Sequence, residues 1–209
     1  IRARLVGSEM CIRDRKFTIL FDLDGTLVDT APDLIRAHNH VMKKFGYPTK
    51  TLGELKNAVG KGAKAMMAKA NGQWKWFDEK IQNDMTNEFL SYYGDNILHE
   101  SKLINGVKEF LNWCKKENIS MAVCTNKTEH LAVDLLKKIG IYDYFEYVAG
   151  YNTFEYCKPD PRHLTTTIEI LDGEINKSIM IGDSETDANA AKAAEILSLI
   201  HISEPTRRA

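Results

Sequence analysis

The sequence is poor in the features that mark disulfide-rich, membrane and nucleic-acid-binding proteins. Of its 209 residues only 4 are cysteine and 5 are proline. The cysteines stand at positions 11, 114, 124 and 157, and no two have the close spacing of zinc ligands. No apolar run approaches the roughly 20 residues of a membrane helix. The formal net charge is −1, which gives no indication of nucleic acid or an anionic membrane as partner.

What remains is the composition of an ordinary globular protein. Hydrophobic residues make up 44% of the chain and charged residues 27%, and the length allows one sizeable domain or a domain with a smaller insert. There is no secretory signal peptide, so we expect a cytoplasmic protein. No pattern in the sequence indicates an oligomeric state.

The two ends of the chain have an unusual relation to each other. Residues 10–15 and residues 197–202 can be encoded by the two strands of one inverted DNA segment, which resembles the transposase adapter used in sequencing-library preparation. We therefore expect residues 1–15 and 197–209 to be foreign and residues 16–196 to be native, the alternative being a pair of genuine tails.

The pattern of apolar residues changes along the chain from a strand, through a helical stretch, to alternating helices and strands. Buried strands are predicted at 17–21, 119–124, 147–149 and 178–181. Helices are predicted from Pro32 to about residue 45, at 52–59, 62–70, 77–92, 106–117, 127–139 and 160–171, and after Asp183. This order predicts an α/β fold with a Rossmann-like parallel sheet, formed by residues 16–30 and 95–196, and a helical insert at 31–94.

Polar clusters follow each predicted strand. They are Asp22-Leu23-Asp24-Gly25-Thr26, Thr125-Asn126, Lys158-Pro159-Asp160-Pro161 and Gly182-Asp183-Ser184-Glu185-Thr186-Asp187. Each cluster alone has a simpler interpretation as a helix cap, a turn or a solvated loop. The carboxyl ends of parallel strands lie at one edge of a sheet, however, and ligands bind at that edge. We therefore expect the four clusters to meet.

The combined residue types are typical of phosphoryl transfer. Carboxylates brought together repel one another unless a cation intervenes, and an all-oxygen site suits Mg²⁺. One Asp can attack phosphorus to give an acyl phosphate, and a second acid two residues later can protonate the leaving oxygen. A hydroxyl and a lysine can donate hydrogen bonds to the transferring group.

These four clusters resemble the sequence motifs of the haloacid dehalogenase-like hydrolases, and the resemblance covers residues 17–196. It implies that Asp22 is the nucleophile and Asp24 the general acid and base. Dehalogenases of the superfamily lack that second Asp, so Asp24 indicates a phosphatase or a phosphomutase.

The resemblance also implies the remaining roles. Thr125 and Asn126 would bind the phosphoryl group, and Lys158 would offset its charge and that of the nucleophile. Asp183 would bind Mg²⁺ together with Asp22 and the Asp24 backbone carbonyl, while Asp187 would coordinate the metal or orient the site.

The helical insert resembles the type-one cap of the superfamily, and the residues within the motifs most resemble those of the phosphoglycolate phosphatases. The implied reaction is hydrolysis of 2-phosphoglycolate to glycolate. We expect Gly60-Lys61-Gly62 to open a cap helix toward the cleft, with Lys61 or Lys64 facing the substrate carboxylate. The alternative is that these lysines are solvated and the glycines only break helices.

The family continues after the fourth motif into one more core strand, which the native part of this sequence lacks. We expect the apolar segment 197–202 to lie in its place at the sheet edge.

Several other functions fit parts of the pattern. They are a β-phosphoglucomutase-like phosphomutase, a phosphatase for sugar phosphates, nucleotides or pyrophosphate, a phosphorylation-controlled receiver domain, and an inactive binding module. A receiver would need neither Asp24 nor a large insert, and an inactive module would not need the complete set of catalytic residues.

Overall fold

A five-stranded parallel sheet forms the core of the protein. The computed structural model describes residues 17–55, 58, 60, 62–69 and 79–200. The strands are β1 (Thr18–Phe21), β4 (Ser120–Cys124), β5 (Tyr147–Ala149), β6 (Ser178–Gly182) and β7 (Leu197–Ile200), in the order β5-β4-β1-β6-β7. All four residues of β1 are buried, as befits a central parallel strand covered on both faces.

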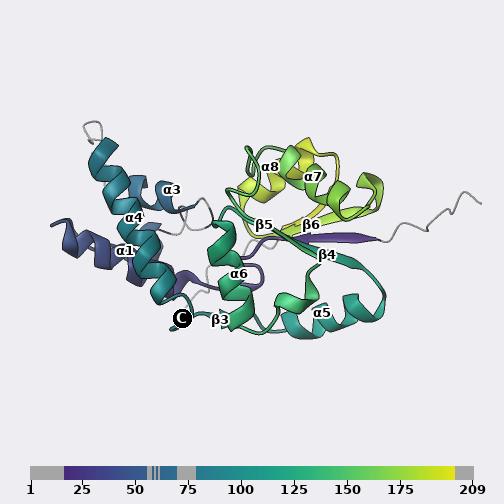
Figure 1. The fold of residues 1–209 in the computed structure, drawn as a ribbon, viewed down its shortest axis with the longest axis horizontal. Helices are drawn as coiled ribbons and strands as arrows, with labels where there is room; N and C mark the ends of the chain where they lie inside the picture. Colours follow the sequence, from purple (N-terminus) through teal and green to yellow (C-terminus); the bar gives the residue numbers. More distant parts are fainter. Residues whose placement is uncertain (1–16, 56–57, 59, 61, 70–78, 201–209) are drawn as a thin grey trace, which may run out of the picture.

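Helices cover both faces of this sheet (Figure 1). The pair α5 (Val107–Lys116) and α6 (Glu129–Lys138) lies on one face, and the pair α7 (Arg162–Ile170) and α8 (Glu185–Ala193) lies on the other. The alternation of side chains along β1 divides the apolar interior accordingly. Ile19 and Phe21 belong to the cluster that contains α5 and α6, whereas Leu20 belongs to the cluster that contains α7 and α8. Two short 3₁₀ helices, Tyr142–Tyr144 and Ile175–Lys177, precede β5 and β6.

A second group of helices lies beside the carboxyl ends of the strands (Figure 1). It consists of α1 (Ala31–Lys44), α2 (Leu52–Leu55), α3 (Ala63–Lys69) and α4 (Glu79–Asp95). The group packs around α4, whose Met85 and Phe89 are buried in the same cluster as Val41 and Met42 of α1. Two short antiparallel strands, β2 (Val28–Asp29) and β3 (Lys102–Leu103), connect this helical group to the sheet.

The predicted α/β fold with a parallel sheet is confirmed, the type-one cap stays a prediction, and the remaining differences are local. The pair β2 and β3 was not predicted, because two residues are too few for a recognisable apolar pattern. The helix predicted at 52–59 is too long, since Ala58 lies in a turn before Gly60, which has a φ of +83°; α2 is described over Leu52–Leu55, and residues 56, 57 and 59 lie outside the described residues. No helix in the described part of the chain is long and apolar enough to cross a membrane.

The edge of the sheet next to β6 is occupied as expected. β7 pairs in parallel with β6, and its described part ends at Ile200. The assignment of residues 31–94 to an insert, and of residues 1–15 and 197–209 to a foreign origin, stays a prediction.

Candidate active site

The ends of three strands and one loop bring the expected side chains to one place. Asp22 follows β1, Thr125 follows β4, and Asp183 follows β6. Lys158 comes from the loop after β5 and reaches the same point, and its side chain is buried. The parallel arrangement of the strands is the cause, because it places all their carboxyl ends at one edge.

Three carboxylates gather at this edge. Oxygens of Asp22, Asp183 and Asp187 all lie within 4.8 Å of one another. The backbone at Gly25 has a φ of +82°, and a Cβ there would overlap the carboxylate of Asp183. Glycine is therefore required at this position on two grounds, backbone conformation and space.

Lys158 holds two of these carboxylates. Its Nζ donates to Asp22 Oδ1 at 2.8 Å and to Asp187 Oδ1 at 2.5 Å. The other oxygen of Asp187 accepts from the backbone N–H and the hydroxyl of Ser184, at 3.1 and 2.6 Å, in a capping box at the start of α8. Both oxygens of Asp187 are thus engaged by the protein itself.

The electrostatics of the cluster favour a bound cation. Burial raises the pKa of Asp22 to about 7, with Lys158 opposing and Asp187 adding to the shift. Burial, Asp187 and Asp24 raise the pKa of Asp183 to about 6. Lys158 alone does not compensate the negative charge. Carboxylate oxygens, here two buried groups and the half-buried Asp183, are the donors that Mg²⁺ prefers, so the residues fit this metal.

Asp24 lies beside the cluster and has partners of its own. Its Oδ1 accepts from the Thr30 hydroxyl at 2.6 Å and lies 3.1 Å from Lys127 Nζ. Lys127 Nζ also donates to the Tyr93 hydroxyl on α4 at 3.0 Å. Burial would lower the pKa of Lys127, but Asp24 and Tyr93 outweigh it and raise this pKa, so the amine is an ammonium.

Thr125 and Asn126 form a tight turn between β4 and α6. The Thr125 hydroxyl accepts from the Lys127 backbone N–H at 3.2 Å, and the Asn126 amide donates to the Lys158 carbonyl at 3.0 Å. The Asn126 Oδ1 is buried and has no hydrogen-bond partner among the described residues. Gly62 of the helical group approaches this turn, since a Cβ there would lie 3.3 Å from the Asn126 carbonyl oxygen.

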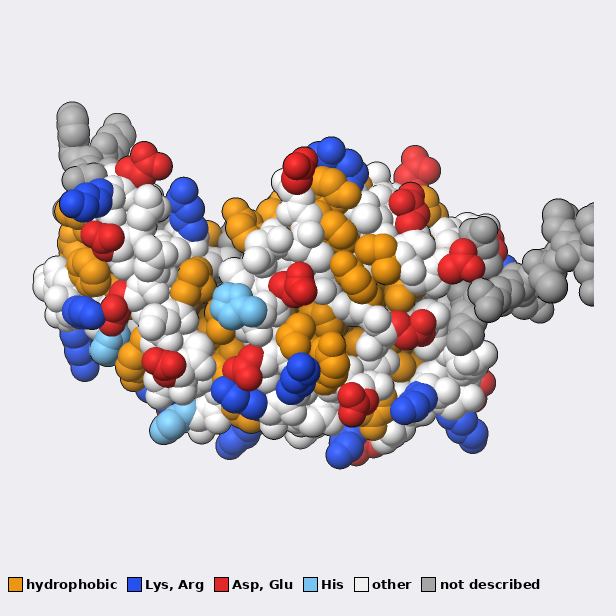
Figure 2. Space-filling view, in the orientation of Figure 1, with side chains coloured by type: hydrophobic (Ala, Val, Ile, Leu, Met, Phe, Trp, Pro, Cys, Tyr) orange, Lys and Arg blue, Asp and Glu red, His pale blue; other side chains and the backbone are white. Residues whose placement is uncertain are grey.

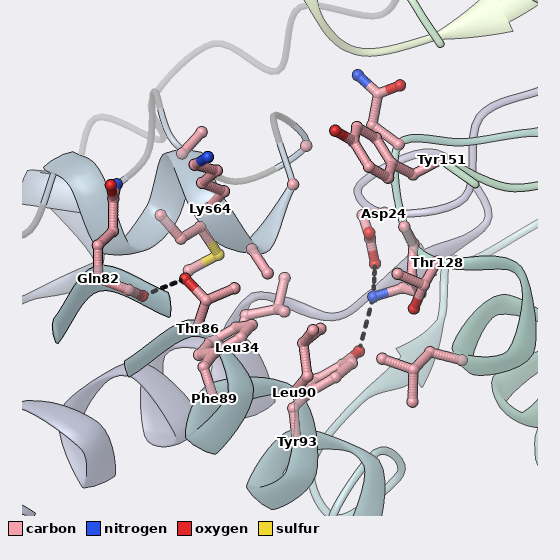
Figure 3. Close-up of a pocket in the computed structure, with 18 residues that line it drawn as sticks. Asp24, Leu34, Lys64, Gln82, Thr86, Phe89, Leu90, Tyr93, Thr128 and Tyr151 are labelled. Atoms are coloured by element: carbon pink, nitrogen blue, oxygen red, sulfur yellow. Dashed lines mark hydrogen bonds and ion pairs between the residues drawn. The ribbon is translucent and has the colours of Figure 1, made fainter. Parts of the chain in front are cut away.

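A cavity of about 560 Å³ lies between the sheet edge and the helical group (Figure 3). Figure 2 shows the outline of the molecule narrowing between these two parts. Asp24 lies at one side of the cavity, and most of the wall is apolar or aromatic. The residues that carry this character are Leu34, Ala63, Ala65, Met66, Phe89, Leu90, Tyr93, Leu131 and Tyr151.

Part of the expected carboxylate-binding segment also lines this cavity. Gly60, Gly62 and Lys64 are among its lining residues, and α3 begins directly after Gly62 at Ala63. Lys61 lies outside the described residues, so its expected role in substrate binding stays a prediction.

Sequence reasoning missed three residues that hold the site together, Thr30, Tyr93 and Lys127. Lys127 directly follows Thr125-Asn126, and this position at a strand end was a usable signal. Thr30 and Tyr93 had no such signal, because their roles depend on the packing of the helical group against the core.

A parallel α/β sheet with a phosphoryl-transfer set of carboxylates, a lysine and a hydroxyl at its carboxyl edge defines a class of hydrolase. Residues 19–200 match the model of the haloacid dehalogenase-like hydrolase family. The chain belongs to this family, and the predicted enzyme class, a phosphoric monoester hydrolase, is confirmed.

Curated relatives and solved structures agree with this assignment. The chain is 40% identical over 181 residues to a phosphoglycolate phosphatase of Agrobacterium fabrum, covering 86% of this chain and 78% of that one. It is 38% identical over 179 residues to a phosphoglycolate phosphatase of Mesorhizobium japonicum, covering 85% and 79%. The structure of a predicted phosphoglycolate phosphatase from Haemophilus somnus 129PT superposes with a TM-score of 0.83 at 28% identity, covering 88% and 84% of the two chains.

Proposed function

We propose that the protein hydrolyses 2-phosphoglycolate to glycolate and phosphate, with Asp22 as nucleophile and Mg²⁺ as cofactor. The observation that carries this proposal is the cluster of Asp22, Asp183 and Asp187, whose oxygens lie within 4.8 Å of one another beside Lys158. The names of the relatives from Agrobacterium fabrum and Mesorhizobium japonicum support the choice of substrate.

The side chains divide the work between two steps. Asp22 attacks phosphorus, the bond to the leaving oxygen breaks, and a phosphoaspartate forms while Asp24 gives its proton to glycolate. Asp24 then takes a proton from water, which attacks phosphorus and releases Asp22. Thr125 and Lys158 donate hydrogen bonds to the phosphoryl oxygens in both steps.

The metal would be held by Asp22, Asp183 and the backbone carbonyl of Asp24. Bound Mg²⁺ neutralises charge on the phosphoryl group and the nucleophile, which allows two anions to meet. Asp187 orients the site in our proposal, because both of its oxygens are already engaged by Lys158 and Ser184.

A second candidate substrate follows from the cavity. Its volume of about 560 Å³ is larger than a two-carbon acid fills, and its wall is mostly apolar. Both properties favour a larger, partly apolar phosphate monoester. A sugar phosphate, the substrate of a β-phosphoglucomutase-like enzyme, fits less well because its many hydroxyls need polar partners. The cytoplasmic location expected from the sequence stays a prediction.

The test is Mg²⁺-dependent phosphate release from a panel of monoesters that includes 2-phosphoglycolate. We expect a preference for 2-phosphoglycolate, and Asp22→Asn should lower kcat by about 1,000-fold or more because no acyl phosphate can form. Chelation of the metal should abolish turnover, and added Mg²⁺ should restore it.

Asp29→Asn is the matched control, because Asp29 is an exposed acid of β2, seven positions beyond Asp22. It should leave kcat within about two-fold of the wild type. Preference for a larger apolar monoester would contradict the proposed substrate and leave the proposed phosphoaspartate mechanism in place. Full activity of the Asp22→Asn protein would refute the phosphoaspartate mechanism.

A further inference from the structure

Lys127 is a buried charge at the cavity wall, paired with Asp24 and lying over the ring of Tyr93 at 4.4 Å from its centre. Only 5% of its side chain is exposed, although lysine is rarely buried without full compensation. Its ammonium has three N–H donors, and in the described part of the chain it has two oxygen partners, Asp24 at 3.1 Å and the Tyr93 hydroxyl at 3.0 Å. Figure 3 labels Asp24 and Tyr93, both of which line the cavity.

The neighbouring residue, Thr128, is incompletely satisfied as well. It lines the same cavity, and its hydroxyl is buried with no hydrogen-bond partner among the described residues. Thr128 is the N-cap of the ten-residue helix α6, but its side chain makes no capping bond. The positive end of the α6 dipole therefore lies next to an unused hydroxyl and a charged lysine.

Two acidic side chains lie near this point, Asp24 as the ion-pair partner of Lys127 and Glu129 as the residue that follows Thr128. The Glu129 carboxylate accepts from the Thr153 hydroxyl at 2.6 Å, and Thr153 belongs to the loop after β5. Lys64, the other lysine among the described residues that line the cavity, is exposed and stands on α3, across the cavity from Thr128 (Figure 3).

We propose that Lys127 and Thr128 form a subsite for a carboxylate carried on the carbon atom next to the phosphate ester. The inference rests on the proposed function and specifies how the leaving group is recognised. The acid Asp24, which protonates the leaving oxygen, lies 3.1 Å from the Lys127 ammonium. In a 2-phosphooxy acid the leaving oxygen and the carboxylate are joined by one carbon, so neighbouring protein groups contact both.

The subsite predicts selection for acids over neutral esters of equal size. The test compares kcat/KM for 2-phosphoglycolate with that for 2-hydroxyethyl phosphate, in which an alcohol replaces the carboxylate. Lys127→Met should lower this ratio roughly 10- to 100-fold, because a charged hydrogen bond to the substrate is lost. Thr128→Val, which leaves the contact of Lys127 with Asp24 intact, should lower the ratio several-fold by the same reasoning. Lys64→Met tests the alternative that the exposed lysine of α3 binds the carboxylate, and it should change the ratio by less than about three-fold. Lys116→Met, at an exposed lysine of α5, is the matched control and should leave the ratio unchanged.

A second readout does not depend on turnover. In the Asp22→Asn background, calorimetric titration with 2-phosphoglycolate in the presence of Mg²⁺ should give weaker binding when Lys127→Met is added. An equal loss on both esters would mean that Lys127 serves only to position Asp24, and would overturn the subsite. A ratio that responds to Lys64→Met and not to the two other variants would overturn it too.

Failure of the proposed function has a different signature. A wild-type protein that is inactive on 2-phosphoglycolate but active on other monoesters would remove the proposed substrate. A wild type that hydrolyses both esters equally well, with a ratio unmoved by Lys127→Met, would keep the phosphatase chemistry and remove the subsite alone.

Discussion

At the scale of single residues, Gly25 and Gly46 share a backbone conformation but have different surroundings. Their φ angles are +82° and +76°, both in the left-handed region. A Cβ at Gly46 would meet no atom within 4 Å, whereas one at Gly25 would overlap the Asp183 carboxylate. The pair therefore separates the cost of the backbone conformation from the need for space beside the carboxylates.

We predict that Gly25→Ala and Gly46→Ala each lower the free energy of unfolding by about 1 to 2 kcal/mol, because alanine is strained at positive φ. Only Gly25→Ala should also raise the Mg²⁺ concentration needed for half-maximal activity, by at least about ten-fold, since it displaces Asp183. Urea unfolding and a Mg²⁺ titration of phosphate release measure the two effects. Equal Mg²⁺ dependence in the two variants would contradict this reading of Gly25.

The residues that the sequence predicted are those with motif chemistry at strand ends. Asp22, Thr125, Lys158 and Asp183 could be found because a strand followed by a polar cluster is a local pattern. The sequence could not predict the partners of Asp24, because those contacts depend on packing between distant segments. Tyr93 meets Lys127 only because α4 packs beside the turn after β4, and nothing local to Tyr93 indicates this contact.

At the scale of elements, Asp33 fastens the first turn of α1 to the segment that follows α4. Its carboxylate accepts hydrogen bonds from the backbone N–H groups of His99, Glu100 and Ser101 and from the Ser101 hydroxyl, at 2.7 to 3.0 Å. Burial alone would raise the pKa of Asp33, but these hydrogen bonds outweigh it and lower the pKa below its ordinary 3.8. One carboxylate thus joins the two ends of the helical group.

Asp33→Asn should lower the free energy of unfolding at pH 7 by about 2 to 4 kcal/mol, because an amide cannot accept this set of hydrogen bonds. Asp134→Asn, which removes an exposed pair with Lys138, should cost no more than about 0.5 kcal/mol. Urea unfolding at pH 7 compares the two variants. A similarly small loss in the free energy of unfolding in both would show that the Asp33 hydrogen bonds do not stabilise the fold.

The same contact fixes the direction of a pH dependence. Because the folded-state pKa of Asp33 is lowered, its contribution is complete above the unfolded value and is lost as the pH falls through the folded value. The difference in stability between wild type and Asp33→Asn should therefore shrink below about pH 4, as seen in unfolding curves at pH 7, 5, 4 and 3. A difference that grew on acidification would contradict the assignment.

At the scale of the whole molecule, β7 completes the sheet through its backbone and contributes little to the core. It pairs with β6 from Ile179↔Leu197 to Gly182↔Ile200. Leu197 and Leu199 are 61% and 55% exposed, an inverted pattern for a strand of a native sheet. Pairing through the backbone requires no particular side chains, so the strand can form whatever the origin of the segment, and the foreign origin stays a prediction.

Replacing both leucines with lysine should leave the thermal midpoint within about 2 °C and should reduce self-association, because charged side chains block edge-to-edge contact. Sedimentation velocity and a thermal melt test the two parts. A drop in the midpoint of about 10 °C would show that the leucines pack in the fold and would count against a foreign origin. The fold class could be predicted because the central strands β1 and β4 are continuous apolar runs. Which segment pairs at the edge beside β6 could not be predicted in the same way, because backbone pairing there accepts any segment that is available.

The pairing of β2 with β3 has a consequence for how such enzymes diversify. The chain leaves the sheet along one of these strands and returns along the other, and Val28 lies opposite Leu103. An intervening segment whose two ends are neighbours can be lengthened, replaced or exchanged between genes without moving the strands that carry Asp22 and Asp183. Evolution can therefore vary the cavity between the helical group and the sheet edge while the residues at the sheet edge are inherited unchanged.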